Sequence, residues 1–217
     1  MTPTSEFRRS RKPVIGLIGG MGSGKSEAAA LFARRGARVV SGDEAGHEAL
    51  RKPEVKAQVV ARWGKEVLTK QGEVDRRKLA GIVFENEEER KALEGIVFPW
   101  IESRLRQEIA EARLDPQAPL IVLDAAIMLE AGWHDECDRL VFIEAPRETR
   151  VARLGQKRGW TAKEVQTREK AQWSLAEKRN HAHDILDNSG SLEDLARQVD
   201  ELLAKWAIVP KVSGSDS

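Results

Sequence analysis

The chain has 217 residues, enough for one α/β domain with inserted subdomains. Its 36 Lys and Arg against 35 Asp and Glu leave a net charge of +1, so nothing in the charge balance argues for a nucleic-acid partner and we expect none. Its one cysteine, Cys137, excludes an intrachain disulfide, and no apolar run reaches the roughly 20 residues of a membrane span, so we expect a cytoplasmic protein that does not bind membranes.

The two ends of the chain are polar. Residues 1–12 are basic and lack the apolar run of a secretory signal, so we expect a disordered leader there. Residues 210–217 are expected to form a disordered tail. For the chain as a whole we expect a monomer or a weak homo-oligomer.

A phosphate-binding loop is the strongest motif of the chain. The apolar residues 14–18 predict a strand, residues 19–26 read Gly-Gly-Met-Gly-Ser-Gly-Lys-Ser, and residues 28–35 predict a helix. Strand, G-x-x-x-x-G-K-S loop and helix follow one another in the order of a P-loop. The alternative, a glycine-rich turn that binds nothing, accounts for neither the Lys-Ser pair nor the two flanking elements. We therefore expect a nucleoside triphosphate site.

Each part of this loop has a chemical task. Glycines let successive N–H groups curl around a phosphate, and the following helix points its positive end at the same place. Lys25 is expected to reach the β- and γ-phosphates, and the Ser26 hydroxyl is expected to ligate Mg²⁺. The predicted nucleotide-binding residues of the loop are Gly20, Met21, Gly22, Ser23, Gly24, Lys25, Ser26 and Glu27.

A second predicted strand, residues 37–40, places Asp43 just beyond its carboxyl end. Ligands of open parallel sheets bind outside the carboxyl ends of the strands, so Asp43 is expected near the phosphates. Alternatively, Asp43 is the N-cap of a helix that begins near Glu44, a role that aspartate fills well. The two roles do not exclude each other.

Residues 53–113 show helical periodicity and no strand pattern. Apolar side chains recur at helical spacing between Val55 and Trp63, and residues 75–84 predict a short helix. Asn86 and Glu89 predict a capping box for a helix at 87–96, and a separate amphipathic helix is expected after it. We interpret this block as an inserted subdomain that binds the second substrate. The alternative is that its helices only cover the sheet.

Three further strands are predicted at residues 120–124, 139–144 and 184–188. The first ends in Asp124 and has the form of a Walker B strand, whose carboxylate supports a Mg²⁺ shell. Ser191 is expected to cap a closing helix with one apolar face. This alternation predicts an α/β fold with a five-stranded parallel sheet sandwiched by helices.

Residues 147–182 are crowded with cations that the nearby acids do not balance. Thr161 and Glu164 predict another capping box, so two helices are expected on either side of residues 159–160. In a P-loop protein, such a basic hairpin favours a lid that closes over the triphosphate. The alternative is a solvated charged face. The candidates for neutralising charge on the transferring phosphoryl group are Arg150, Arg153 and Arg158.

With these residues in view, residues 14–206 resemble the dephospho-coenzyme A kinases. The shared features are the phosphate-binding loop, Asp43, Asp75-Arg76 with Leu79 leading to Val83-Phe84, Glu130 after an apolar stretch, Arg150 with Arg153, Gln172 with Lys178, and the run from Ile185 to Gly190. The chain has Glu27, Ser41, Phe98 and Ala126 where that family usually has Thr, Asp, His and Pro.

The resemblance implies transfer of the ATP γ-phosphoryl group to the ribose 3′-hydroxyl of dephospho-CoA, giving CoA and ADP. It implies ATP, Mg²⁺ and dephospho-CoA as ligands, a catalytic set of Lys25, Asp43, Arg150 and Arg153, and nucleotide contacts from Arg158 and Asn188. The expected organisation is a P-loop core at residues 13–50, 114–146 and 183–209, an acceptor-binding subdomain at 51–113 and a lid at 147–182.

Three other functions remain as alternatives. One is a small-molecule P-loop kinase with a nucleoside, nucleotide or sugar acceptor. Another is a GTPase-like switch, against which the chain lacks an Asn-Lys-x-Asp motif. The last is a degenerate homologue that binds ATP without turnover, a hypothesis that Ser41 and Phe98 motivate.

Overall fold

The computed structural model describes residues 12–211, with the side chains of all but residues 84 and 85. The predicted leader at 1–12 and tail at 210–217 lie outside the described residues, apart from Lys12, Pro210 and Lys211. Along the described chain, no helix combines the length and the apolar character that crossing a membrane requires.

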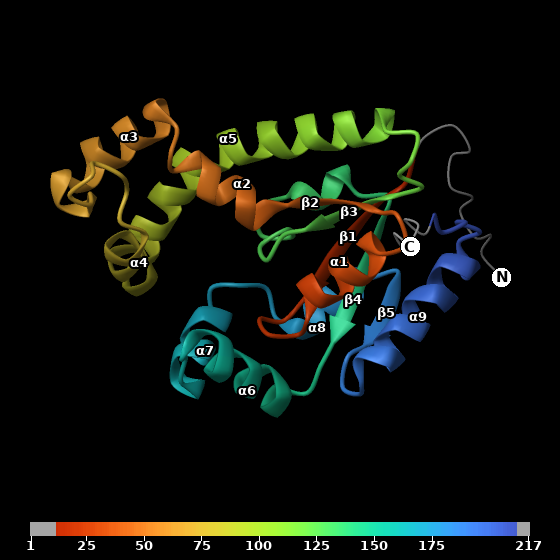
Figure 1. Ribbon diagram of the computed structural model, residues 1–217. Helices are drawn as coiled ribbons and strands as arrows, with labels where there is room; N and C mark the ends of the chain where they lie inside the picture. The colour runs from red at the N-terminus through yellow and green to blue at the C-terminus, as the bar shows by residue number, and fades with distance from the viewer. Residues whose placement is uncertain (1–11, 212–217) are drawn as a thin grey trace. The chain divides into compact units, whose positions relative to one another are not determined.

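Five parallel strands form the sheet (Figure 1). They are β1 (Val14–Gly19), β2 (Arg38–Ser41), β3 (Ile121–Asp124), β4 (Arg139–Glu144) and β5 (Asp184–Asp187). Their spatial order is β2-β3-β1-β4-β5, which puts β1 in the centre between β3 and β4. This order confirms the predicted five-stranded parallel sheet. Apolar runs of this kind suit strands that are buried on both faces.

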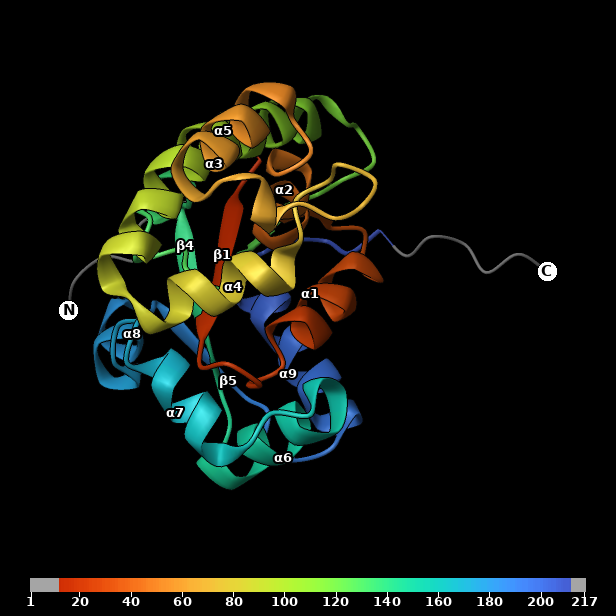
Figure 2. The same ribbon diagram turned by 90° about the vertical axis from the view of Figure 1, so that its left-hand side faces the viewer.

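Helices cover both faces of the sheet. Figure 2 shows α1 (Lys25–Ala33) and α9 (Leu192–Lys205) on one side of the strands and α8 (Leu175–His181) on the other. The α9 helix begins at Ser191, whose hydroxyl accepts a hydrogen bond from the Asp194 N–H, so the predicted cap is confirmed. Phe32 of α1 stacks on Trp206 with ring centroids 6.5 Å apart, and both are buried in the main core.

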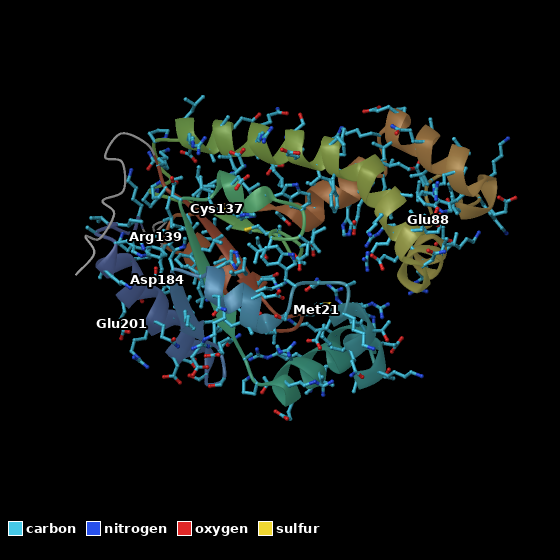
Figure 3. All side chains as sticks on the ribbon, turned by 180° about the vertical axis from the view of Figure 1, so that it is seen from behind. Met21, Glu88, Cys137, Arg139, Asp184 and Glu201 are labelled. Carbon is cyan, nitrogen blue, oxygen red and sulfur yellow. The ribbon has the colours of Figure 1, made fainter. Side chains whose placement is uncertain are left out.

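The starts of β4 and β5 are joined by an ion pair. Arg139 and Asp184 lie side by side (Figure 3), with 3.6 Å between Arg139 Nη1 and Asp184 Oδ2. Asp184 also accepts hydrogen bonds from Lys205 and from the Trp206 indole, which tie α9 to β5. Because Asp184 is buried, these partners offset the cost of removing its charge from water.

The chain separates into two compact units, one made of residues 1–41 and 108–217 and the other of Gly42–Gln107. The second unit contains α2 (Gly42–Ala49), α3 (Pro53–Trp63), a short 3₁₀ helix (Lys65–Val67), α4 (Arg76–Glu85) and most of α5 (Glu87–Leu114). It has its own core around Val55, Val59 and Leu79. The first unit resumes after Gln107, within α5.

The prediction of two helices between residues 87 and 113 is wrong, because α5 runs through that stretch without a break and contains Pro99. A proline inside a helix removes one hydrogen bond at a cost of about 3 kcal/mol. Apolar residues on both sides of it, including Val97 before it and Leu105 after it, are packed and hold the helix together. Only half of the predicted capping box forms: Asn86 Oδ1 accepts from the Glu89 N–H at 3.4 Å, and also from the Glu88 N–H, whereas the Glu89 carboxylate accepts from Arg62 and Trp63.

The segment predicted to be a lid, residues 147–182, forms three helices instead of the two predicted. They are α6 (Arg147–Arg158), α7 (Ala162–Glu169) and α8. The capping box of Thr161 and Glu164 is confirmed at the start of α7. Ser174 and Glu177 form a further capping box at the start of α8, a Ser-x-x-Glu signal that was readable in the sequence and was missed.

Cys137 lies just before β4, after a short 3₁₀ helix (Trp133–Glu136), and packs its sulfur against Met128 Sδ at 3.8 Å. Burial, with nearby carboxylates adding to it, raises the pKa of the Cys137 thiol to about 12. The thiol is therefore protonated at pH 8, and we expect iodoacetamide to label the native protein at least about 100-fold more slowly than the unfolded protein. Mass spectrometry of timed aliquots measures both rates; equal rates would contradict this environment.

Candidate functional site

The phosphate-binding loop leaves β1 and enters α1 through backbone conformations that favour glycine. Gly19, Gly22 and Gly24 have φ angles of 147°, 76° and 95°. A Cβ on Gly22 would lie 2.6 Å from the Arg150 carbonyl oxygen, so the loop has no room for side chains there. The Ser23 hydroxyl is buried and has no hydrogen-bond partner within the described residues. A cradle of backbone N–H groups at a helix N-terminus is suited to an anion.

Lys25 and Ser26 open α1 and occupy the positions that a triphosphate site requires. Lys25 Nζ donates to the carbonyl oxygens of Gly19 and Gly20 at 3.2 and 3.1 Å, so the ammonium folds back over the loop. Ser26 Oγ donates to Asp124 Oδ2 at 2.9 Å. The predicted Walker B carboxylate at the end of β3 therefore meets the loop hydroxyl directly.

Gly24 is the loop position least able to change. A Cβ there would lie 2.0 Å from Asn188 Nδ2, the atom that donates to the Ser23 carbonyl at 2.8 Å. We expect Gly24→Ala to displace Asn188 and to weaken ATP binding about tenfold or more, a loss of about 1.4 kcal/mol. Titration with ATP and Mg²⁺ measures the effect.

Gly159→Ala is the matched control for that substitution. Gly159 has a φ of 69°, and no atom lies within 4 Å of the place where a Cβ would sit, so the alanine brings the same backbone strain without a collision. Equal losses of ATP affinity in the two variants would show that backbone strain, and not the packing of Asn188 on the loop, is responsible.

Three buried or partly buried side chains hold the loop from outside. Arg150 donates to the Met21 carbonyl at 3.3 Å and forms an ion pair with Glu169 of α7. Arg153 donates to the carbonyls of Ser23 and Asn188 at 3.4 and 3.3 Å. Figure 3 shows Met21 beside the lid helices. The structure thus brings the predicted residues Arg150, Arg153 and Asn188 to the loop, where they bond its backbone.

Two other predicted nucleotide-binding residues have different neighbours. Arg158, at the end of α6, is exposed, and its guanidinium carbon lies 4.9 Å from the centre of the Trp160 ring. Glu27 pairs with Lys157 of α6 at 3.6 Å, so the acidic charge next to the loop has a basic partner. Arg158 is therefore not among the side chains that bond the loop in the described structure.

A pocket of about 150 Å³ lies beside the loop. Gly20 and Arg150 line one side, the end of β4 and residues after it line another, and Leu175, Ala176 and Arg179 of α8 line the rest. Arg179 forms an ion pair with Glu144 at the end of β4. The pocket thus lies at the carboxyl end of a sheet strand and has two arginines in its wall, which suits a phosphorylated ligand.

In the second unit, Asp43 is exposed and lies in the first turn of α2, which begins at Gly42. The predicted N-cap role is wrong, because the helix starts one residue before Asp43. One turn along α2, burial and then the charge of Arg76 lower the pKa of His47, with Arg51 adding to them and Asp43 and Glu44 opposing. His47, one turn after Asp43, is thus within reach of the charges of two arginines.

Sequence reasoning missed the acids that pair with the site's cations. Arg150 was predicted as a site residue without its partner Glu169, and the pair of Arg179 and Glu144 was not predicted. Both ion pairs form in the structure. Glu130 and Lys178 were noted as separate positions, and the structure joins them at 2.9 Å. No local pattern marks such pairs, because their members come from different elements.

Comparison with known proteins gives a consistent result. The family model described as dephospho-CoA kinase matches residues 13–194. A dephospho-CoA kinase from Geobacillus kaustophilus is 36% identical over 198 residues, covering 91% of this chain and 98% of the relative. One from Bacillus licheniformis is 37% identical over 199 residues, with the same coverage of both chains.

Solved structures agree with this. The protein TT1252 from Thermus thermophilus has a TM-score of 0.75 at 36% identity, covering 90% of this chain and 98% of that one. Dephospho-CoA kinase from Campylobacter jejuni has a TM-score of 0.67 at 21% identity, covering 89% and 96%. Shikimate kinase from Acinetobacter baumannii has a TM-score of 0.53 at 20% identity, covering 89% and 94%. The last two show that this chain shares its fold with those two kinases.

Proposed function

The chain belongs to the dephospho-CoA kinase family, and from this membership we propose that it transfers the γ-phosphoryl group of ATP to the ribose 3′-hydroxyl of dephospho-CoA. The products are CoA and ADP, so the reaction completes the synthesis of coenzyme A. The resemblance found in the motifs is confirmed by the family match, and the fold is that of a P-loop kinase.

The contact between Ser26 and Asp124 is the observation that carries the proposal. Their oxygens are 2.9 Å apart, close to the roughly 3.0 Å that separates neighbouring oxygens around an octahedral Mg²⁺ ion with bonds of about 2.1 Å. The described residues hold no cluster of three or more His, Cys, Asp or Glu side chains suited to a metal. Mg²⁺ needs only a few protein ligands when substrate phosphates and water complete its coordination shell. Ser26 and Asp124 thus fit a Mg²⁺ ion, which would neutralise charge on the phosphates.

The side chains of the loop supply positioning and charge. We assign Lys25 to the transferring phosphoryl group, with the backbone N–H groups of residues 20–25 around the phosphates. Arg150 and Arg153 support this set by bonding the carbonyls of Met21 and Ser23, which holds the loop backbone in place. Asp43 is assigned as the base that accepts or orients the proton of the attacking hydroxyl.

The acceptor is assigned to the helical unit. Most cations there have acidic partners, as Lys52 does in Glu48 and Arg62 in Glu89. The charges of Arg51 and Arg76 both lower the pKa of His47, which lies one turn after Asp43 on α2. Two cations close enough to this turn of α2 to act on His47 suit an acceptor that carries phosphate groups. We further propose that the enzyme acts in the cytoplasm, a compartment that suits its protonated, partly buried thiol.

Direct product analysis tests this function. Purified protein is incubated with ATP, Mg²⁺ and dephospho-CoA, and CoA and ADP are quantified by liquid chromatography. Formation of both in equal amounts is expected. ATP binding without CoA would overturn the assignment, and parallel reactions with nucleosides, shikimate and sugars would then identify another acceptor or leave a binding protein.

A further inference from the structure

Glu130 lies between β3 and the 3₁₀ helix at 133–136, and the proposed chemistry does not use it. Its Oε1 accepts two hydrogen bonds, one from Lys178 Nζ and one from the Trp173 backbone N–H, both at 2.9 Å. The side chain of Lys178 is 3% exposed and that of Glu130 is 15% exposed. A charged pair with this little access to water links the segment after β3 to α8.

Lys178 has a second acceptor within the same loop. Its Nζ lies 3.1 Å from Gln172 Oε1, so one ammonium joins Glu130 to the turn that precedes α8. Glu130 Oε2 is buried and has no hydrogen-bond partner among the described residues. Because removing one member of a buried ion pair leaves the other charge uncompensated, the position of Lys178 depends strongly on Glu130.

The first turn of α8 rests on the phosphate-binding loop. A Cβ placed on Gly20 would lie 3.1 Å from Leu175 Cδ2, so Leu175 packs directly on the loop backbone. Leu175, Ala176 and Arg179 all line the pocket beside the loop. Lys178 lies one turn after Leu175 and next to Arg179. A shift of Lys178 therefore moves the α8 wall of that pocket.

We propose that Glu130 is a positioning residue for the nucleotide phosphates. Through Lys178 it fixes α8 against Gly20 and sets Arg179 in the pocket wall, where the guanidinium faces phosphate oxygens of the bound nucleotide. This role depends on the proposed function in one respect, which is that ATP is the ligand. It assigns a task to a carboxylate that touches neither the loop nor any group in the reaction.

The substitution Glu130→Gln tests the role because glutamine keeps an acceptor for the Trp173 N–H and removes the charge. We expect the Kd for ATP with Mg²⁺ to rise about tenfold and the KM for ATP to rise with it. At saturating ATP, kcat should stay within about threefold of the unchanged protein, because Lys25, Ser26 and Asp43 are intact. Calorimetric titration gives Kd without the acceptor, and steady-state assays give KM and kcat.

A purely structural role predicts a different pattern. Thermal unfolding of Glu130→Gln would then show a lowered Tm, while the folded protein would keep the Kd for ATP of the unchanged chain. That result would overturn the proposal, as would an unchanged Kd together with an unchanged Tm. Glu201→Gln is the matched control, since it removes a carboxylate from an exposed ion pair with Arg197 on α9 and should change neither quantity.

The double variant Glu130→Gln, Lys178→Met keeps the test decisive if the single variant does not fold. It removes both buried charges at once and so avoids an uncompensated one. The proposal predicts a folded protein whose Kd for ATP is still raised about tenfold, and recovery of the original Kd would contradict it. Because these titrations contain no dephospho-CoA, a protein that binds ATP and makes no CoA overturns the proposed reaction and leaves this result intact.

Discussion

Replacing Lys25 with methionine is expected to lower kcat for CoA formation by about 10²–10³-fold or more while the protein stays folded. In the proposed mechanism, the Lys25 ammonium is the positive charge that the loop places next to the transferring phosphoryl group. Methionine has a similar length and no charge. The loop should keep its shape, because Gly19, Gly22 and Gly24 set its backbone and Arg150 and Arg153 hold its carbonyls.

Two measurements support the interpretation of the Lys25 variant. Quantified CoA gives kcat, and circular dichroism with a thermal scan reports the fold. Lys91→Met is the control, since Lys91 forms an exposed ion pair with Glu87 on α5 and such pairs contribute at most about 1 kcal/mol. A Lys25→Met protein that keeps more than about a tenth of the original kcat would remove Lys25 from the catalytic set.

The substitution Asp43→Asn is expected to lower kcat by about 10²–10⁴-fold, the range for loss of a general base. Asparagine has the shape of aspartate and cannot accept the proton of the attacking hydroxyl. Stability should change little, because Asp43 is exposed and does not cap α2. An acid in the first turn of a helix contributes about 0.3–1 kcal/mol through the helix dipole.

Glu44→Gln is the matched control for Asp43, since it removes the neighbouring acid of the same helical turn. Stopped-time assays should show kcat for Glu44→Gln within about threefold of the unchanged protein. The pH profile of kcat adds a further check: the acid limb should disappear in Asp43→Asn. If both variants lose the same small factor, Asp43 acts through the helix and not as the base.

The position of Arg150 changes how its role is understood. Charge alone predicts that it meets the transferring phosphoryl group, yet it is buried, paired with Glu169 and bonded to the Met21 carbonyl. These contacts support a role in shaping the loop. Arg150 also lines the pocket beside Gly20, so direct contact between its guanidinium and a bound phosphate remains part of the proposed mechanism.

The missed elements share a physical origin. The break predicted near Pro99 does not occur, because apolar residues on both sides of the proline pack in the interior and offset one lost hydrogen bond. The third lid helix was overlooked because α8 has only seven residues, too few for a periodic apolar pattern. Tertiary packing, which no local pattern reports, holds both segments helical: α5 around Pro99 packs in the core of the second unit, and α8 packs against β1 and β4.

Local sequence was sufficient for the loop, the five strands and the caps at Thr161 and Ser191. Each depends on neighbours in the chain: glycines permit the positive φ angles, apolar runs form buried strands, and a hydroxyl bonds an N–H three residues away. The same motifs were enough to identify the family.

Only the tertiary structure decided which charges meet. It paired Ser26 with Asp124, Arg150 with Glu169 and Glu130 with Lys178, and the two members of each pair come from different segments of the chain. Whether a charge is buried, and which partner compensates it, depends on how those elements pack, and packing is not encoded in any short stretch of residues.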